Sequence, residues 1–547
     1  MNKFSAKPLA VLMLLMVLGF QQFTTAQPYN GKRPKLVVGL VVDQMRWDFL
    51  YRYYSRYGEG GFKRLIAQGF SAENTLIPYA QSITAPGHAC VYTGSTPAIN
   101  GIVGNDWFDA QQGKGVYCVE DDSVQIVGGV ANSDPMSPKN LFATTITDEL
   151  RLATNFQSKV VGVAIKDRGA ILPAGHTGTA YWYEGANGSF VSSTWYMNAL
   201  PAWAQDFNNK KLVDEYYKKN WNTLYPVDSY TLSDIDNNPY EGRTSGDAAP
   251  VFPHDLQRFI GKDYGAIRST PYGNTLTLDF AKEALKAEKL GADAVTDFLA
   301  VSLSSTDYIG HQYGPNSIEI EDTYLRLDKD LAEFFKFLDA EVGKNEYVFF
   351  ITADHGVAHV PAYLSKHNIK VSTVTSTAAD INRKVLNKFG VPSIIRSFGN
   401  SQVYLNYRNI DSVGKNANEI ADFIAQELKK LPYMLDAFSY HQVANLTLST
   451  MLKEKFLLGF NPARSGDIQI VLKPGYFYGG NSGTTHGTMY PYDAHIPMVF
   501  MGWGITPGRT NRVTYMTDIS ATLAALLHIQ MPSGSIGSPI VEILPQH

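Results

Sequence analysis

Cysteine and excess charge are both scarce in this chain of 547 residues. The two cysteines, Cys90 and Cys118, do not have the spacing of a metal motif, which excludes a thiolate metal site. One disulfide and two buried free thiols are the alternatives, and the sequence does not decide between them. A net charge of −4 gives no electrostatic basis for wrapping a nucleic-acid backbone, so we expect no nucleic acid polymer as a partner. Small anionic substrates are not excluded, because a metal ion or a local basic pair can supply the field.

Long apolar runs are also few, and the clearest stands at the N-terminus. Residues 9–20 are apolar, follow Lys3 and Lys7, and form a run too short to span a bilayer comfortably. The small residues that end at Ala26 supply a cleavage point. We therefore predict that residues 1–26 are a signal peptide and that the mature protein is periplasmic or secreted, without a membrane partner. A retained membrane anchor is the alternative.

Apolar, β-branched runs predict strands that are buried on both faces. They cover residues 35–43, 159–165, 297–303 and 347–353, and a later run covers residues 495–501. Helical patterns lie between them, at residues 274–287, 322–339, 416–431 and 517–528. Strands that alternate with helices predict an α/β fold with a largely parallel central sheet flanked by helices on both faces.

Charged side chains stand where the predicted strands end. The first strand ends at Asp43, the second at Lys166-Asp167-Arg168, the third near Asp307 and the fourth at Asp354-His355. Because ligands of such sheets bind beyond the carboxyl ends of the strands, these side chains are expected to converge on one site. The alternative for any single aspartate is an ordinary turn or capping residue.

Histidines near these strand ends add metal-ligand chemistry. Asp307 and His311 are four residues apart, so a helix would place both on one ion, and His486 lies in a loop of small residues. Adjacent Asp354 and His355 can diverge toward two neighbouring ions. Nitrogen and carboxylate donors without thiolate suit zinc, with manganese or iron as alternatives. A hydrogen-bonded structural role is the alternative for each histidine taken alone.

A threonine supplies the predicted nucleophile. Thr84 and Pro86 precede a short predicted helix, residues 89–92, which Gly94 ends. A hydroxyl at this position lies at the positive end of the helix dipole, where phosphate or a developing alkoxide is stabilised. A purely capping role for Thr84 is the alternative.

Together these motifs resemble the alkaline phosphatase superfamily, over nearly all of the mature chain. The resemblance is closest to exported, phosphate-irrepressible bacterial alkaline phosphatases with a Thr nucleophile, which are similar to type I phosphodiesterases and nucleotide pyrophosphatases. It rests on the strand that ends at Asp43 and on residues 84–88, 104–107, 166–168, 305–311, 353–356 and 483–486.

The resemblance implies a two-zinc site. One zinc ion would be held by Asp43, Asp354, His355 and the Thr84 oxygen, and the other by Asp307, His311 and His486. Asn105, Lys166 and Arg168 would contact the phosphoryl oxygens. Thr84 would be the catalytic nucleophile that becomes phosphorylated during turnover.

The implied protein is an exported alkaline phosphatase that acts as a monomer on small phosphate monoesters. Residues 27–547 would form its catalytic domain, with insertions at about 171–290 and 360–475. Lys166 and Arg168 favour monoesters, because they offset the second negative charge of a monoester dianion. A phosphodiesterase or nucleotide pyrophosphatase of the same superfamily is the first alternative. A sulfatase is disfavoured, since neither cysteine has the required context, and a non-catalytic metal-dependent binding protein is the alternative from another class.

Overall fold

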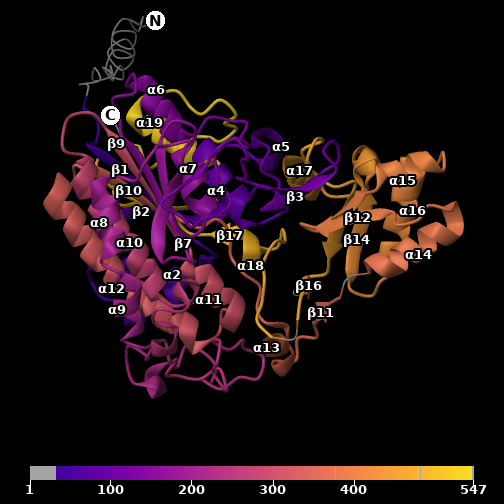
Figure 1. Cartoon of the computed structure of the whole chain (residues 1–547), viewed down its shortest axis with the longest axis horizontal. Helices are drawn as coiled ribbons and strands as arrows, with labels where there is room; N and C mark the ends of the chain where they lie inside the picture. Colours follow the sequence, from indigo (N-terminus) through magenta and orange to yellow (C-terminus); the bar gives the residue numbers. More distant parts are fainter. Residues whose placement is uncertain (1–31, 376, 481, 545–547) are drawn as a thin grey trace, which may run out of the picture.

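The four main apolar runs form the centre of one large sheet (Figure 1). They are β1 (Leu36–Val42), β6 (Val160–Ala164), β9 (Asp297–Leu303) and β10 (Tyr347–Thr352). With β7 (Thr179–Glu184), they run parallel in the order β10-β1-β9-β6-β7. The computed structural model describes residues 32–375, 377–480 and 482–544. The predicted signal peptide, residues 1–26, lies outside the described residues.

Further strands extend this parallel centre on both sides. Beyond β10 lie β18 (Met498–Gly502), β2 (Gly69–Leu76), β17 (His495–Ile496) and β19 (Gly508–Tyr515), and beyond β7 lie β8 (Ser189–Ser193) and β5 (Ile126–Val127). They join the sheet through antiparallel pairs, except that β19 pairs with β2 in parallel. The run predicted as one strand at 495–501 is divided at Pro497, which has no N–H to donate to a ladder. The predicted α/β fold is confirmed, with a parallel centre and mixed edges.

Helices cover both faces of the sheet. On one face, α7 (Asp167–Ala174) packs so closely on β6 that a Cβ at Gly162 would lie 2.3 Å from the carbonyl oxygen of Ala170. On the other face, Tyr181 of β7 packs against Phe280 of α10 (Tyr272–Glu288), with ring centroids 5.3 Å apart. Gly162 and Tyr181 point to opposite faces, because Tyr181 pairs with Val163, the neighbour of Gly162. The stretch predicted as an insertion at 171–290 thus supplies β7, β8 and α10 to these layers.

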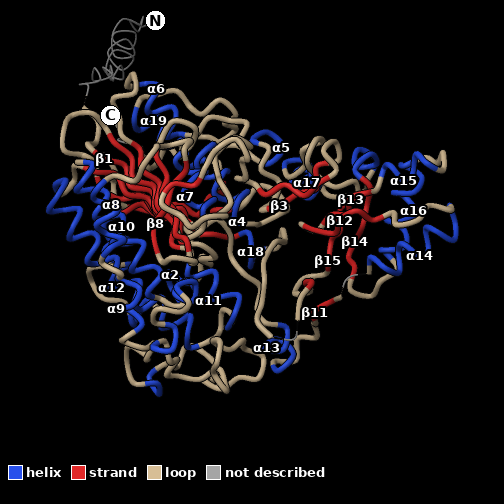
Figure 2. The backbone as a smooth tube through the Cα atoms, in the orientation of Figure 1, coloured by secondary structure: helices blue, strands red, loops and turns tan. Residues whose placement is uncertain are grey.

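Residues 378–472 fold into a small lobe beside the main body (Figure 2). Its antiparallel sheet has the order β12-β13-β15-β14, and α14 (Ala378–Phe389) and α16 (Ala417–Lys429) contribute to a separate apolar core. The strands are β12 (Ile395–Gly399), β13 (Gln402–Leu405), β14 (Met434–Ser439) and β15 (Ile468–Leu472). Short β11 (Thr373–Val374) and β16 (Phe477–Tyr478) pair where the chain enters and leaves the lobe. The insertion boundaries at 360–475 stay a prediction.

The structure also bears on the two cysteines and on membrane-spanning helices. Cys90 and Cys118 are both buried and both free, so the structure contains no disulfide between them. Within the described part of the chain, no helix combines the length and apolarity needed to cross a bilayer.

Candidate active site

The polar side chains predicted at strand ends lie at one edge of the sheet. Asp43 follows β1, Lys166 follows β6, and Asp354 and His355 follow β10. Asp307 lies in the first turn of α11 (Ser305–Tyr313), directly after β9. These four strands are parallel neighbours, so their carboxyl ends bring the side chains into one buried cluster, as the charge pattern predicts.

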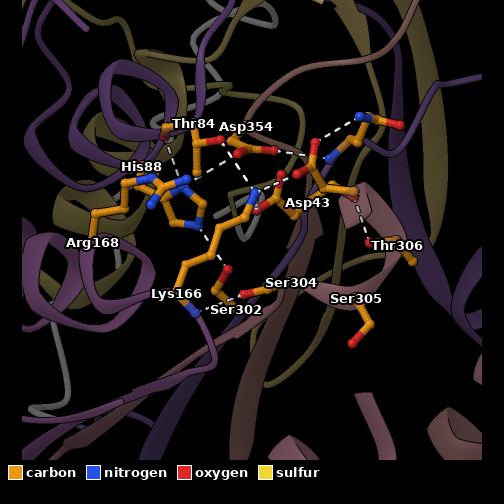
Figure 3. A network of polar contacts seen from close by, with 12 residues as sticks. Asp43, Thr84, His88, Lys166, Arg168, Ser302, Ser304, Ser305, Thr306 and Asp354 are labelled. Atoms are coloured by element: carbon orange, nitrogen blue, oxygen red, sulfur yellow. Dashed lines mark hydrogen bonds and ion pairs between the residues drawn. The ribbon is translucent and has the colours of Figure 1, made fainter. Parts of the chain in front are cut away.

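Thr84 begins α4 (Thr84–Thr93) rather than capping it. The preceding Ile83 is extended, and the side-chain Oδ1 of Asn105 accepts the backbone N–H of Ala85 at 3.0 Å. Gly94 ends the helix in the left-handed conformation, with φ 62°. The Thr84 hydroxyl is therefore not used as a cap and faces the cluster. Its Oγ1 lies 3.3 Å from Nε2 of His355. The same atom lies 3.5 Å from Nζ of Lys166 (Figure 3).

A glycine allows α4 to approach the cluster. A Cβ at Gly87 would lie 2.5 Å from the carbonyl oxygen of Asp354, closer than real side chains come. The close approach of α4 to Asp354 therefore requires a residue without a side chain at position 87.

The six predicted metal ligands form two groups, in the predicted partition. Asp43, Asp354 and His355 make one group, and Asp307, His311 and His486 make the other. Within each group, one donor atom from each residue lies within 4.8 Å of those from the others. The one-turn spacing of Asp307 and His311 on α11 places Nε2 of His311 3.1 Å from Oδ1 of Asp307.

Each of the three histidines is oriented by a backbone carbonyl. Nδ1 of His311 lies 2.8 Å from the Thr484 oxygen, Nδ1 of His355 lies 2.9 Å from the Gly356 oxygen, and Nδ1 of His486 lies 2.7 Å from the Ser82 oxygen. Because a carbonyl only accepts, Nδ1 carries the proton and Nε2 of the neutral ring has a free lone pair.

These Nε2 atoms face carboxylates. Nε2 of His355 lies 3.3 Å from Oδ2 of Asp354, and Nε2 of His486 lies 3.6 Å from Oδ1 of Asp307. Burial lowers the pKa of His355 to about 4 and holds the pKa of His486 well below its usual range, so both rings are neutral. Each of these Nε2 lone pairs therefore faces a carboxylate and is available to bind a cation.

The carboxylates support the same conclusion. Burial, with the nearby Asp43, raises the pKa of Asp354. Burial also opposes ionisation of Asp307, but His311 and Lys166 outweigh it and hold its pKa well below the usual range. Oδ1 of Asp43 and Oδ2 of Asp354 are buried without a hydrogen-bond partner. The donor set and its excess of buried negative charge fit divalent cations.

Lys166 joins the two groups. Its Nζ lies 2.8 Å from Oδ2 of Asp43 and 2.6 Å from Oδ2 of Asp307, and the residue is only 4% exposed. Burial lowers the pKa of Lys166, but the two carboxylates outweigh burial and raise it. The ammonium group is therefore charged and stands beside the Thr84 hydroxyl.

Arg168, in the first turn of α7, is the second basic residue of the site. Figure 3 shows its side chain directed toward Thr84 and His88. Its Nη1 donates to the hydroxyl of Tyr117 at 2.9 Å, and that hydroxyl donates to Oδ1 of Asp167 at 2.5 Å. Tyr117 and Asp167 hold the guanidinium group in place, a role that the sequence analysis did not assign to them.

Two more residues of the cluster were missed. Gln44 has a left-handed φ of 66°; its backbone N–H donates to Oδ1 of Asp354 at 3.1 Å and its Nε2 donates to Oδ1 of Asp307 at 2.6 Å. His88 donates Nδ1–H to the Thr84 carbonyl oxygen at 2.9 Å, and its Nε2 lies 2.8 Å from Oγ of Ser302. Their positions beside Asp43 and one helical turn after Thr84 were the available signals.

Comparisons with known proteins agree with this arrangement. Residues 37–495 match the family described as type I phosphodiesterase / nucleotide pyrophosphatase. Alkaline phosphatase PhoV of Synechococcus elongatus is 52% identical over 94% of each chain. A Myroides odoratus protein named calcium-transporting ATPase is 52% identical over 96% of this chain and 98% of its own.

A solved structure is also similar. The crystal structure of alkaline phosphatase PafA, a protein of Elizabethkingia meningoseptica, superposes with a TM-score of 0.92. It is 48% identical and covers 94% of this chain and 99% of that chain. A PafA variant in which a threonine, an asparagine, a lysine and an arginine are replaced gives the same TM-score of 0.92.

Proposed function

The chain belongs to the type I phosphodiesterase / nucleotide pyrophosphatase family, and on this basis we propose that it is an alkaline phosphatase that hydrolyses small phosphate monoesters. One observation carries the proposal. The Thr84 hydroxyl lies next to His355, which belongs to the candidate metal-binding group of Asp43, Asp354 and His355, and next to the ammonium group of Lys166. That position combines a nucleophile with the positive charge that a phosphoryl group requires.

Two zinc ions fit the proposed site. One would be held by Asp43, Asp354, His355 and the Thr84 oxygen, and the other by Asp307, His311 and His486. Bound zinc supplies Lewis-acid chemistry: it lowers the pKa of a bound hydroxyl or water and offsets charge on an ester oxygen. The carbonyl-oriented histidines and the unpartnered oxygens of Asp43 and Asp354 support this assignment.

The residues of the chain then account for the phosphoryl transfer. Thr84 loses its proton to solvent and its Oγ attacks phosphorus, while the bond between phosphorus and the ester oxygen breaks and the alcohol leaves with a proton. Lys166, Arg168 and the amide of Asn105 bind the non-bridging oxygens. Water then attacks the phosphothreonine, which releases inorganic phosphate and restores the Thr84 hydroxyl.

Monoesters are favoured over diesters by charge. A monoester dianion carries one more negative charge than a diester; the buried Lys166 beside the Thr84 hydroxyl and the partly buried Arg168 would supply two positive charges. The PafA variant with four replaced residues supports this set, because its residue types are those of Thr84, Asn105, Lys166 and Arg168. A phosphodiesterase is the alternative within the family.

We further propose that the protein is exported. Residues 1–26 would be the signal peptide, and residues 27–547 would form the mature catalytic domain in the periplasm or outside the cell. The proposed protein acts as a monomer, with insertions at about 171–290 and 360–475.

The test compares kcat/KM for an aryl phosphate monoester with that for the matching diester, on zinc-loaded protein with a chelator control. A strong monoester preference that the chelator abolishes and zinc restores is expected. A diester preference would overturn the roles of Lys166 and Arg168. ATP belongs in the panel, because the name of the Myroides relative includes ATPase and ATP hydrolysis is also phosphoryl transfer to water. Inactivity toward every ester would overturn the enzyme assignment.

A further inference from the structure

A cavity of about 470 Å³ lies between the small lobe and the main body. Three segments form its walls: β12 and the turn that follows it, the paired strands β11 and β16, and the loop that carries His486. Its volume is within the range of small-molecule sites. Of the residues proposed for the active site, only the metal ligand His486 is among the described residues that line the cavity.

The cavity is nevertheless adjacent to the phosphoryl site. On one side it is lined by His486, whose Nε2 lies 3.6 Å from Oδ1 of Asp307. On the other side it is lined by Asn400, whose Nδ2 donates to the carbonyl oxygen of Asp106 at 2.6 Å. Asp106 follows Asn105, which holds the start of α4 at Ala85. The cavity thus adjoins both loops that flank Thr84.

The lining has the chemistry of an alcohol site rather than a phosphate site. Phe398 and Tyr478 meet edge to face with centroids 5.4 Å apart, and Val374, Leu472 and Phe477 add apolar surface. Asn400 and nearby threonines supply polar groups, and none of the described residues that line the cavity is an aspartate, glutamate, lysine or arginine. Such a wall favours uncharged apolar or aromatic groups.

We propose that this cavity receives the alcohol portion of the phosphate monoester and selects apolar or aromatic alcohols over small polar ones. The inference rests on the proposed function, because the ester oxygen must lie at the group of Asp307, His311 and His486. From that group, the alcohol extends past His486 into the space between the lobes. The small lobe therefore determines substrate specificity without touching the reacting atoms.

The first experiment varies the alcohol and keeps the chemistry constant. Ethyl, n-butyl and n-hexyl phosphate have leaving groups of nearly equal basicity but different apolar area. For the zinc-loaded full chain we expect kcat/KM to rise by roughly fourfold for each added methylene that the cavity buries. A flat series overturns the inference and leaves the phosphatase assignment intact, whereas no turnover of any ester counts against the phosphatase assignment itself.

The second experiment fills the cavity. Gly399 lines it, and a Cβ there would meet no other atom within 4 Å, so Gly399→Trp places a ring in open space. We expect the ratio of kcat/KM for hexyl to ethyl phosphate to fall at least tenfold. Gly115→Trp is the matched control, since Gly115 also faces open space but lies on the exposed strand β4 (Lys114–Tyr117).

Inorganic phosphate serves as the folding check in both variants. Inhibition by phosphate reports that the site around Thr84 is assembled, independently of the alcohol. A hexyl-to-ethyl ratio that stays at the wild-type value in Gly399→Trp, with phosphate inhibition intact, overturns the inference.

Discussion

Nζ of Lys166 lies 2.6 Å from Oδ2 of Asp307, so a proposed phosphoryl-binding group is paired with a proposed metal ligand. The same ammonium group lies 2.8 Å from Oδ2 of Asp43, which belongs to the other candidate metal-binding group. One buried cation thus holds together carboxylates that would otherwise repel one another. Bound metal ions would compensate these carboxylates and leave the ammonium group available to a phosphoryl oxygen.

Replacing Lys166 with methionine tests this double role. Lys166→Met keeps the length of the side chain and removes its charge. We expect kcat/KM for an aryl phosphate monoester to fall by about 10²–10³-fold, the usual loss when one donor to a transition-state oxygen is removed. The loss for the matching diester should be much smaller, because a diester carries less negative charge.

Metal content separates this effect from a damaged site. Zinc bound to the Lys166→Met protein, measured by elemental analysis, should equal or exceed the wild-type value, because no ammonium group competes for Asp43 and Asp307. Equal losses on monoester and diester would contradict the charge argument.

Thr84 is predicted to be the nucleophile. Thr84→Ala should lower turnover of monoesters by at least roughly a thousandfold, since water alone must then attack phosphorus. Thr84→Ser keeps a hydroxyl at the same position and should retain most of the activity. Both variants should bind zinc nearly as well as the wild type, because all six aspartate and histidine ligands are unchanged and only the Thr84 oxygen is altered. A fully active alanine variant would exclude the nucleophile assignment.

Metal binding should stabilise the folded protein. The three buried carboxylates and three oriented histidines are assembled only in the native state, so zinc binds that state preferentially. A zinc concentration of a hundred times Kd adds roughly 2.7 kcal/mol to the free energy of unfolding for each site. Native mass spectrometry should find two zinc ions on the wild type and one on His486→Ala. An unfolding midpoint that zinc does not raise would contradict the two-site proposal.

Tyr117 is predicted to position Arg168. Tyr117→Phe removes the hydroxyl that accepts from Nη1 of Arg168 and donates to Asp167. We expect kcat/KM for aryl phosphate to fall by roughly tenfold, in line with the free energy of one hydrogen bond to a charged group. Inhibition by inorganic phosphate should weaken in parallel, and zinc content should not change.

A second tyrosine provides the control for that experiment. Tyr183 also donates through its hydroxyl, to the carbonyl oxygen of Tyr264 at 2.8 Å, away from the cluster. Tyr183→Phe should leave phosphate inhibition at the wild-type level. If both phenylalanine variants weaken phosphate binding equally, Tyr117 has no specific role.

The sequence was sufficient for those parts of the site that depend on local pattern. Each buried strand ends at the residue where the apolar run ends, so Asp43 and Asp354 could be placed from the sequence. The spacing of Asp307 and His311 likewise needs only one helical turn. His486 was a candidate ligand because it lies in a loop of small residues, and the resemblance to known phosphatases placed it with Asp307 and His311.

Features that depend on long-range packing could not be predicted in this way. Gln44 reaches two carboxylates because its backbone adopts a left-handed φ of 66°, which nothing in its neighbours requires. Tyr117 meets Arg168 only because a hairpin, β3 (Asp106–Asp109) with β4, lies over α7. The cavity beside His486 forms where the small lobe meets the main body, across more than a hundred residues of sequence.

A partly buried carboxyl outside the proposed active site allows a test of pH dependence. Asp330 lies on α12 (Ile318–Leu338) and accepts a hydrogen bond from Oγ1 of Thr275 at 2.8 Å. Burial raises the pKa of Asp330 to about 6. Because the unfolded chain releases this proton near pH 4, wild-type stability should fall as pH rises from about 4 to about 6. Asp330→Asn removes this loss and can still accept from Thr275.

The two proteins should therefore be equally stable at pH 4 and differ at pH 8. We expect the asparagine variant to be more stable at pH 8 by roughly 2–3 kcal/mol, as the raised pKa implies. Urea unfolding of chelator-treated protein measures the difference without a contribution from metal loss at low pH. Asp206→Asn, which removes the same charge from an exposed position, is the control. A stability difference of the same size at pH 4 and pH 8 would show that the substitution acts through packing and not through the proton held by Asp330.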